Sequence, residues 1–190
     1  MSLAALVAAA VTAVAPTPEA PIVVDGKPIS RGFLRHWAEI AALSSGAPEP
    51  RIGKNERRQA AALLIGRRWI LGEARERGIR VARGKVRAEY RIQVRQSFPR
   101  RADYLEFLRG TGQEPRHIRS RIAMDILSDR IRRQVLDGIE DAQARREALD
   151  AFVVEFRRKW GSRTVCRAPW VTEDCGQGQA ASSAATTRSA

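Results

Sequence analysis

Apolar side chains recur at the spacing of an α-helix in six successive segments of this chain, and this repetition most constrains its fold. Residues three, four and seven positions apart share one helix face, so each segment would bury one apolar stripe. Gly, Pro or capping residues separate the segments. The sequence therefore predicts an all-α, mainly helical protein, with about six helices at 31–43, 55–77, 84–98, 103–109, 114–136 and 142–160.

A short β segment precedes the predicted helices. Residues 21–29 (PIVVDGKPI) are rich in β-branched side chains and contain Asp25-Gly26, a dipeptide typical of tight turns. Ser30 is then a suitable N-cap for the first helix, and Asn55 for the second. The second helix is apolar almost all round over Ala60–Ile65 and again over Trp69–Leu71, so we expect it to be the central buried helix.

The two ends differ from the middle in composition. Residues 1–15 (MSLAALVAAAVTAVA) are uncharged and end in Ala13-Val14-Ala15, which resembles a secretory cleavage site, although no basic residue precedes the apolar run. A cleaved or truncated export signal is one interpretation, and a disordered Ala-rich leader is the other. The predicted organisation is a leader at 1–21, a helical domain at 22–165 with a returning helix at 142–160, a loop at 166–175, and a disordered tail at 176–190.

The two cysteines, Cys166 and Cys175, lie near the end of the chain. The spacing is not that of a C-x-x-C redox motif, and no third cysteine or nearby histidine completes a zinc site. An even pair behind a possible export signal favours one disulfide and an extracytoplasmic (secreted or cell-envelope) location. The alternative is two free thiols in a cytosolic protein.

The chain is strongly basic, with Lys+Arg 34 against Asp+Glu 21 and a net charge of +13. In the third predicted helix a cationic ridge repeats every four residues, formed by Arg83, Arg87, Arg91 and Arg95. Such a ridge could contact nucleic-acid phosphates or an anionic membrane surface. The alternative is a solvated face on an Arg-rich protein.

Candidate catalytic groups are sparse. His36 and His117 lie on different predicted helices without a neighbouring nucleophile in sequence, and we expect His36 to be a partly exposed helix residue. Glu73 and Glu76 lie among arginines, so ion pairs within the helix explain them better than acid–base catalysis does. The sequence predicts no enzyme activity, no metal site, no cofactor and no small-molecule substrate.

Several segments together resemble the N-terminal domain of SurA-type chaperones, in the variant of secreted actinobacterial foldases. The resemblance is carried by VDGKPISRGFLRHW, LLIGRRWILGEARERGIRV, RQSFPRRADYLEFLRGTGQ and IAMDILSDRIRRQV, and by EALDAFVVEFRRKWGSRTVCRAPWVTEDC near the end. In that family a helical module is interrupted by a parvulin-type prolyl isomerase domain, and a last helix returns to the module. Here 137–141 (DGIED) stands in the place of the isomerase, so that activity is not carried over to any residue.

The resemblance implies an ATP-independent holdase that binds unfolded or newly exported polypeptides in an apolar helical groove. The candidate client-binding residues are Tyr90, Phe98, Tyr104 and Phe107, for which an ordinary core role is the alternative. A basic protein that binds nucleic acid or another polyanion is the second hypothesis. A prolyl isomerase is the third, and it follows only from the family label.

Overall fold

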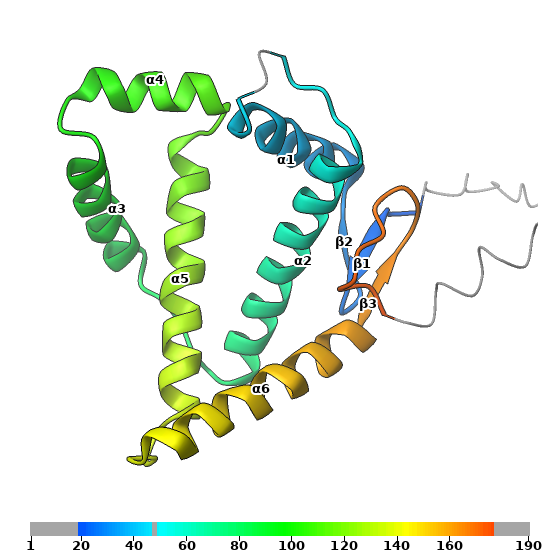
Figure 1. The fold of residues 1–190 in the computed structure, drawn as a ribbon, viewed down its shortest axis with the longest axis vertical. Coiled ribbons are helices and arrows are strands. Elements are labelled where there is room, and N and C mark those ends of the chain that lie inside the picture. Colours follow the sequence, from blue (N-terminus) through cyan, green and yellow to red (C-terminus); the bar gives the residue numbers. More distant parts are fainter. Residues whose placement is uncertain (1–18, 47–48, 177–190) are drawn as a thin grey trace, which may run out of the picture.

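Six helices and a three-stranded sheet make up the described part of the chain, residues 19–46 and 49–176 of a computed structural model (Figure 1). The predicted mainly helical fold is confirmed. The predicted leader (1–21) and tail (176–190) lie outside the described ranges except for residues 19–21 and Gly176. The elements in order are β1 (Ile22–Val24), β2 (Lys27–Ile29), α1 (Arg31–Ser44), α2 (Lys54–Glu76), α3 (Arg83–Ser97), α4 (Arg101–Thr111), α5 (Pro115–Val135), α6 (Ala142–Ser162) and β3 (Thr164–Cys166).

The helices form an open frame (Figure 1). Helices α2 and α5 stand side by side, α4 crosses the upper end of α5 toward α1, and α6 runs along the lower end from α5 to the sheet. The connection between α2 and α3 passes behind α5 in this view, so α3 flanks α5 on the side away from α2. Helices α3 and α4 contain no fully buried residue, and they form an exposed arm on the frame.

Local signals account for most helix ends. Ser30 caps α1 as predicted, because its hydroxyl accepts the N–H of Phe33 at 3.2 Å. The predicted cap Asn55 is wrong: α2 begins one residue earlier, at Lys54, and the Glu56 carboxylate accepts the N–H of the N-cap residue Gly53 at 2.8 Å. Glu56, the third residue of the helix, thus supplies the side-chain hydrogen bond at this end, and the Asn55 side chain does not.

The small sheet joins the two ends of the described chain. Its order is β2-β1-β3, and both pairings are antiparallel, so β1 is the central strand, with Ile22 opposite Ile29 on one side and Cys166 on the other. The β1–β2 hairpin turns at Asp25-Gly26 as predicted, with positive φ at both residues, as a type I′ turn requires. The third strand was not anticipated from the sequence.

The main core surrounds α2, as its all-round apolar sequence predicts. Side chains of α2 such as Leu64, Ile65 and Trp69 pack with the sheet and with Trp160 of α6. Helix α6 meets α2 at Gly72, where an added Cβ would lie 2.0 Å from Cη2 of Trp160. The returning helix therefore docks on α2, and the absence of a side chain at Gly72 makes room for its indole ring.

A buried carboxylate also fastens α6 to α2. Glu73, only 3% exposed, accepts hydrogen bonds from Lys159 Nζ at 2.6 Å, Trp160 Nε1 at 2.9 Å and Arg77 Nε at 2.6 Å. Burial alone would raise its pKa, but these three donors hold the Glu73 pKa at about 2. The predicted intrahelical pairing accounts only for Arg77, since Lys159 and Trp160 belong to α6. Glu76 likewise pairs across helices, with Lys159 and Arg163.

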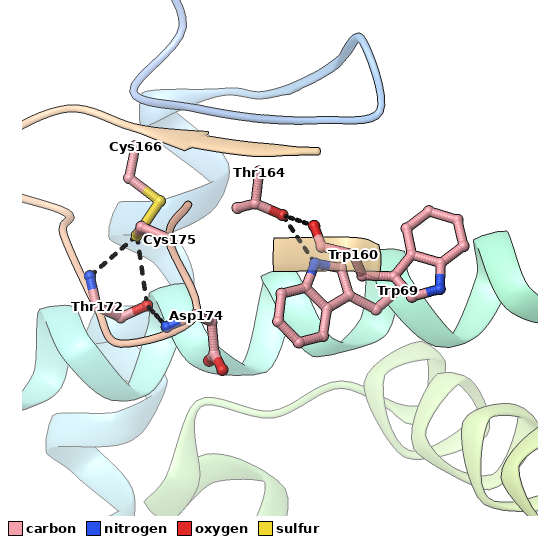
Figure 2. The surroundings of a disulfide bond; sticks show 7 residues. All are labelled: Trp69, Trp160, Thr164, Cys166, Thr172, Asp174 and Cys175. Carbon is pink, nitrogen blue, oxygen red and sulfur yellow. Dashed lines mark hydrogen bonds between the residues drawn. A yellow bond between two sulfur atoms is a disulfide. The ribbon is translucent and has the colours of Figure 1, made fainter. Parts of the chain in front are cut away.

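Cys166 and Cys175 form a disulfide beside the sheet (Figure 2). The buried Cys166 ends β3, and Cys175 packs against the main core, while Thr164 links Trp69 to the Trp160 carbonyl in the same region. A disulfide of this kind indicates an oxidising, extracytoplasmic environment. Over the described ranges, no helix combines the length and apolar character needed to cross a bilayer.

Candidate functional site

One hollow in the described structure is a groove between α2, α3 and α5, which we call the arginine groove. Its walls come from the second half of α2, the connection 78–81, the first turns of α3 and the first half of α5. The hollow has a volume of about 1100 Å³. This is at the upper end of the range for small-molecule pockets, so the groove has room for an extended chain segment.

The floor of the groove is apolar. It consists of aliphatic side chains and one methionine from all of these segments: Leu71, Ile79, Val81, Val86, Met124 and Leu127. Several of them also pack on a second core cluster, centred on Ala74, Leu127 and Ile131. The floor is therefore the outer surface of a packed core, which holds these side chains in place.

The rim of the groove is cationic. Seven arginines line it, and none of the other described lining residues is acidic: Arg67, Arg75, Arg80, Arg83, Arg87, Arg116 and Arg119. Two of them are neutralised, because Arg75 pairs with Asp25 at 3.2 Å and Arg116 with Glu114 at 2.6 Å. Arg119 lies over the ring of Tyr90, at 5.4 Å from its centroid.

Five rim arginines have no carboxylate partner among the described residues: Arg67, Arg80, Arg83, Arg87 and Arg119. Arg67 is the most enclosed of these, and burial, with a smaller effect of Arg68, lowers the pKa of its guanidinium. Elsewhere on the helices, arginines such as Arg100, Arg132 and Arg158 pair with carboxylates three residues away. Others, such as Arg91, Arg95 and Arg121, have no carboxylate partner among the described residues either. The groove is therefore distinguished by its lining, which contains seven arginines and no acidic residue.

Helix α3 presents only part of its cationic ridge to the groove. Arg83 and Arg87, in its first turns, line the hollow together with Val86. Arg91 and Arg95, one and two turns further along the same helix, are exposed and do not line it. The predicted ridge therefore divides into two rim residues and two residues on the open surface.

A second hollow of about 670 Å³ adjoins the groove and shares Arg67, Arg116 and Ser120 with it. Here the structure brings His36 and His117 together, with 3.4 Å between their Nε2 atoms. The backbone N–H of Glu114 donates to Nδ1 of His117, so the neutral ring carries its proton on Nε2 and donates it to His36. Burial and the nearby His36 lower the pKa of His117, which favours this neutral form.

The four predicted client-binding aromatic residues meet in one cluster, where α3 joins α4. The Phe98 ring lies 5.4 Å from that of Tyr104 and 5.1 Å from that of Phe107, and the Tyr90 and Tyr104 hydroxyls are 2.6 Å apart. Burial and this hydrogen bond raise the pKa of Tyr104. All four are half-buried and none lines the arginine groove. Their contacts hold α3 to α4, and their role in client binding stays a prediction.

Sequence reasoning missed the arginine groove, although part of its signal was available. The i, i+4 pair Arg83 and Arg87 was recognised, and Arg116 and Arg119 show a similar spacing on α5. Arg67 and Arg68 interrupt an otherwise apolar stretch of α2, and charged side chains in such a stretch are a signal of a specific role.

Comparison with protein-family models, with curated proteins and with solved structures returns no match. The described residues contain no group of three or more His, Cys, Asp or Glu side chains that could hold a metal ion. The resemblance to SurA-type chaperones therefore stays a prediction from the sequence.

Proposed function

We propose that this protein is an ATP-independent, extracytoplasmic holdase, and that unfolded segments of exported polypeptides bind in the arginine groove. The observation that carries the proposal is the combination of an apolar floor with an open hollow of about 1100 Å³. An unfolded chain exposes apolar side chains, and covering them in such a groove prevents them from associating with one another.

The character of the floor suits weak binding of many sequences. Aliphatic side chains and Met124 provide contact that is not directional, since dispersion and burial depend on area rather than on a fixed geometry. Leu71, on the floor, is 39% exposed in the structure, so a bound chain would remove apolar surface from water. A holdase needs this kind of contact, because its clients share unfolded character and not a sequence.

The disulfide and the resemblance support the proposed setting. The Cys166–Cys175 bond fits a protein that works outside the reducing cytoplasm, and export by an N-terminal signal would bring it there. Between α5 and α6, where the related chaperones carry an isomerase domain, residues 136–141 form only a short turn and connection. We therefore expect holding activity without catalysis of prolyl isomerisation.

The test is suppression of the aggregation of a heat-unfolded client protein, followed by light scattering without ATP. The Leu71→Ser variant removes apolar contact from the floor, and Leu105→Ser on α4 is the matched control, since Leu105 is similarly exposed, at 42%, but lies outside the groove. Loss of one buried leucine contact corresponds to roughly a three- to tenfold higher protein concentration for equal protection. Equal protection by the wild type and Leu71→Ser would exclude the groove as the client site.

A polyanion-binding protein is the second candidate, favoured by the five unpaired rim arginines. Its signature is binding of single-stranded nucleic acid that falls by orders of magnitude between about 50 and 200 mM salt. Client holding through the apolar floor should persist over the same range. A prolyl-peptide assay on the same preparation tests the third hypothesis, and turnover above the slow uncatalysed rate would support it.

A further inference from the structure

We infer that the arginine groove selects one class of client segment: extended stretches in which apolar residues alternate with Asp or Glu. This inference rests on the proposed function, and it adds a chemical preference to the holding activity. A groove with only an apolar floor would accept acidic and basic segments alike. The rim of this groove gives it a means to distinguish them.

The first argument is charge. Of the seven rim arginines, five have no carboxylate partner among the described residues, so the groove carries positive charge that nothing nearby neutralises. Carboxylates of a bound segment would neutralise it through charge-assisted hydrogen bonds. A basic segment would instead add like charges in a partly enclosed site, which is unfavourable.

The second argument is geometry. The α5 side of the groove extends from Arg116 to Leu127, a rise of about 16 Å along the helix. About five residues of extended chain cover that length. Successive side chains of an extended chain point to opposite faces. An alternating segment would therefore direct its apolar residues to the floor while its carboxylates stay at the level of the rim.

The third argument concerns where the charges lie. The unpaired arginines belong to separate walls: Arg67 to α2, Arg80 to the connection, Arg83 and Arg87 to α3, and Arg119 to α5. Carboxylates repeated along a chain can reach separate walls, whereas a single lipid headgroup offers one concentrated charge. Among the described lining residues none is aromatic, so the groove lacks the stacking surface on which single-stranded nucleic acids are commonly held.

The experiment compares four labelled seven-residue peptides by fluorescence anisotropy. One alternates Leu and Glu. The second replaces Glu by Gln, the third replaces Glu by Lys, and the fourth keeps Glu but replaces Leu by Ser. We expect the Leu/Glu peptide to bind about tenfold more tightly than the Leu/Gln peptide, with the Leu/Lys and Ser/Glu peptides weaker still.

A matched pair of variants places the preference at the groove. The double variant Arg83→Gln/Arg87→Gln removes two rim charges, and Arg91→Gln/Arg95→Gln removes two charges from the same helix outside the groove. The first should weaken Leu/Glu binding about five- to tenfold and leave Leu/Gln binding unchanged. The second should change the affinity for either peptide less than about twofold.

The outcomes separate this inference from the proposed function. Equal affinity for the Leu/Glu and Leu/Lys peptides, with aggregation still suppressed, overturns the acidic preference and leaves the holdase intact. No peptide binding together with no suppression of aggregation overturns both. If the Ser/Glu peptide, an oligothymidylate or a vesicle with anionic lipid binds as tightly as the Leu/Glu peptide, charge alone drives binding, and the groove belongs to a polyanion-binding protein.

Discussion

Alanine at Gly72 should destabilise the protein, although alanine in the middle of a helix ordinarily stabilises it. Gly72 lies in α2, where replacing glycine with alanine favours the helix by about 0.5–1 kcal/mol. A Cβ at this position would lie 2.0 Å from Cη2 and 2.5 Å from Cζ3 of Trp160. Carbon atoms in contact are about 3.5–4.0 Å apart, so the indole ring would have to move by more than about 1 Å.

The size of the effect follows from what that movement disrupts. Overpacking a core costs about 1–3 kcal/mol. The displaced ring would also lose the hydrogen bond from Trp160 Nε1 to Glu73, and a bond to a charged group contributes about 1.5–3 kcal/mol. After subtracting the helix preference, the Gly72→Ala variant should lose about 2–5 kcal/mol of unfolding free energy.

Urea denaturation followed by circular dichroism measures this difference, and the same helix offers a control. At Gly66, an added Cβ has no other atom within 4 Å, so Gly66→Ala should gain about 0.5–1 kcal/mol. The urea midpoints of the two variants should therefore shift in opposite directions from the wild-type midpoint, with similar m-values. If Gly72→Ala is as stable as the wild type, α6 does not pack against α2 at this glycine.

Three further predictions concern the attachment of the C-terminal part of the chain. Because the Glu73 pKa is lowered to about 2, the contribution of its ionised form to stability is present above pH 4.5 and is lost as the pH falls from about 4.5 toward 2. The Glu73→Gln variant should therefore show a weaker dependence of unfolding free energy on pH in this range, and at neutral pH it should be less stable than the wild type by about 3 kcal/mol. Replacing Cys166 with Ser opens a loop of ten residues and should lower the free energy of unfolding by about 2.5–3 kcal/mol. Thermal denaturation beside the oxidised wild type measures this loss, and an unchanged melting temperature would contradict it. Truncation after Asp141 removes Trp160 and β3 and should leave an aggregating or molten product by near-UV circular dichroism, whereas cooperative melting at the parent temperature would show that α6 contributes nothing.

The helices were predictable because their signals are local. Ser30, Gly78 and Pro99 mark helix ends through backbone chemistry that needs no distant partner, and the apolar spacing gives each helix its buried face. The Asn55 cap failed because α2 begins at Lys54, which places Asn55 inside the first turn, where Glu56 reaches back to the N–H of Gly53. Sequence alone does not fix a helix start to a single residue.

The features that were missed depend on distant parts of the chain. Strand β3 has three residues, and only its pairing with Ile22–Val24 makes it a strand. Gly66 and Gly72 look alike in sequence, and only the position of Trp160 distinguishes them.

The candidate site was the least predictable part. The arginine groove collects Arg67, Arg83 and Arg119 from three helices, and their meeting is set by how the connection 78–81 passes behind α5. The aromatic residues Phe98 and Tyr104 were recognised as a group, since they lie close together in sequence. The sequence did not predict which surface these side chains face, because half-buried aromatic residues at a helix–helix corner are compatible with packing between the helices and with binding a client.

The central position of β1 in the terminal sheet has a consequence for the order in which the protein can mature. On the proposed export route, a chain threaded through a membrane N-terminus first delivers β1 and β2 early, and their hairpin can close at once. The other edge of β1 stays unpaired until Thr164–Cys166 arrives, and only then can the cysteine that ends β3 find Cys175. On that route, native disulfide formation reports that the chain has been delivered at least as far as Cys175, the later of the two cysteines.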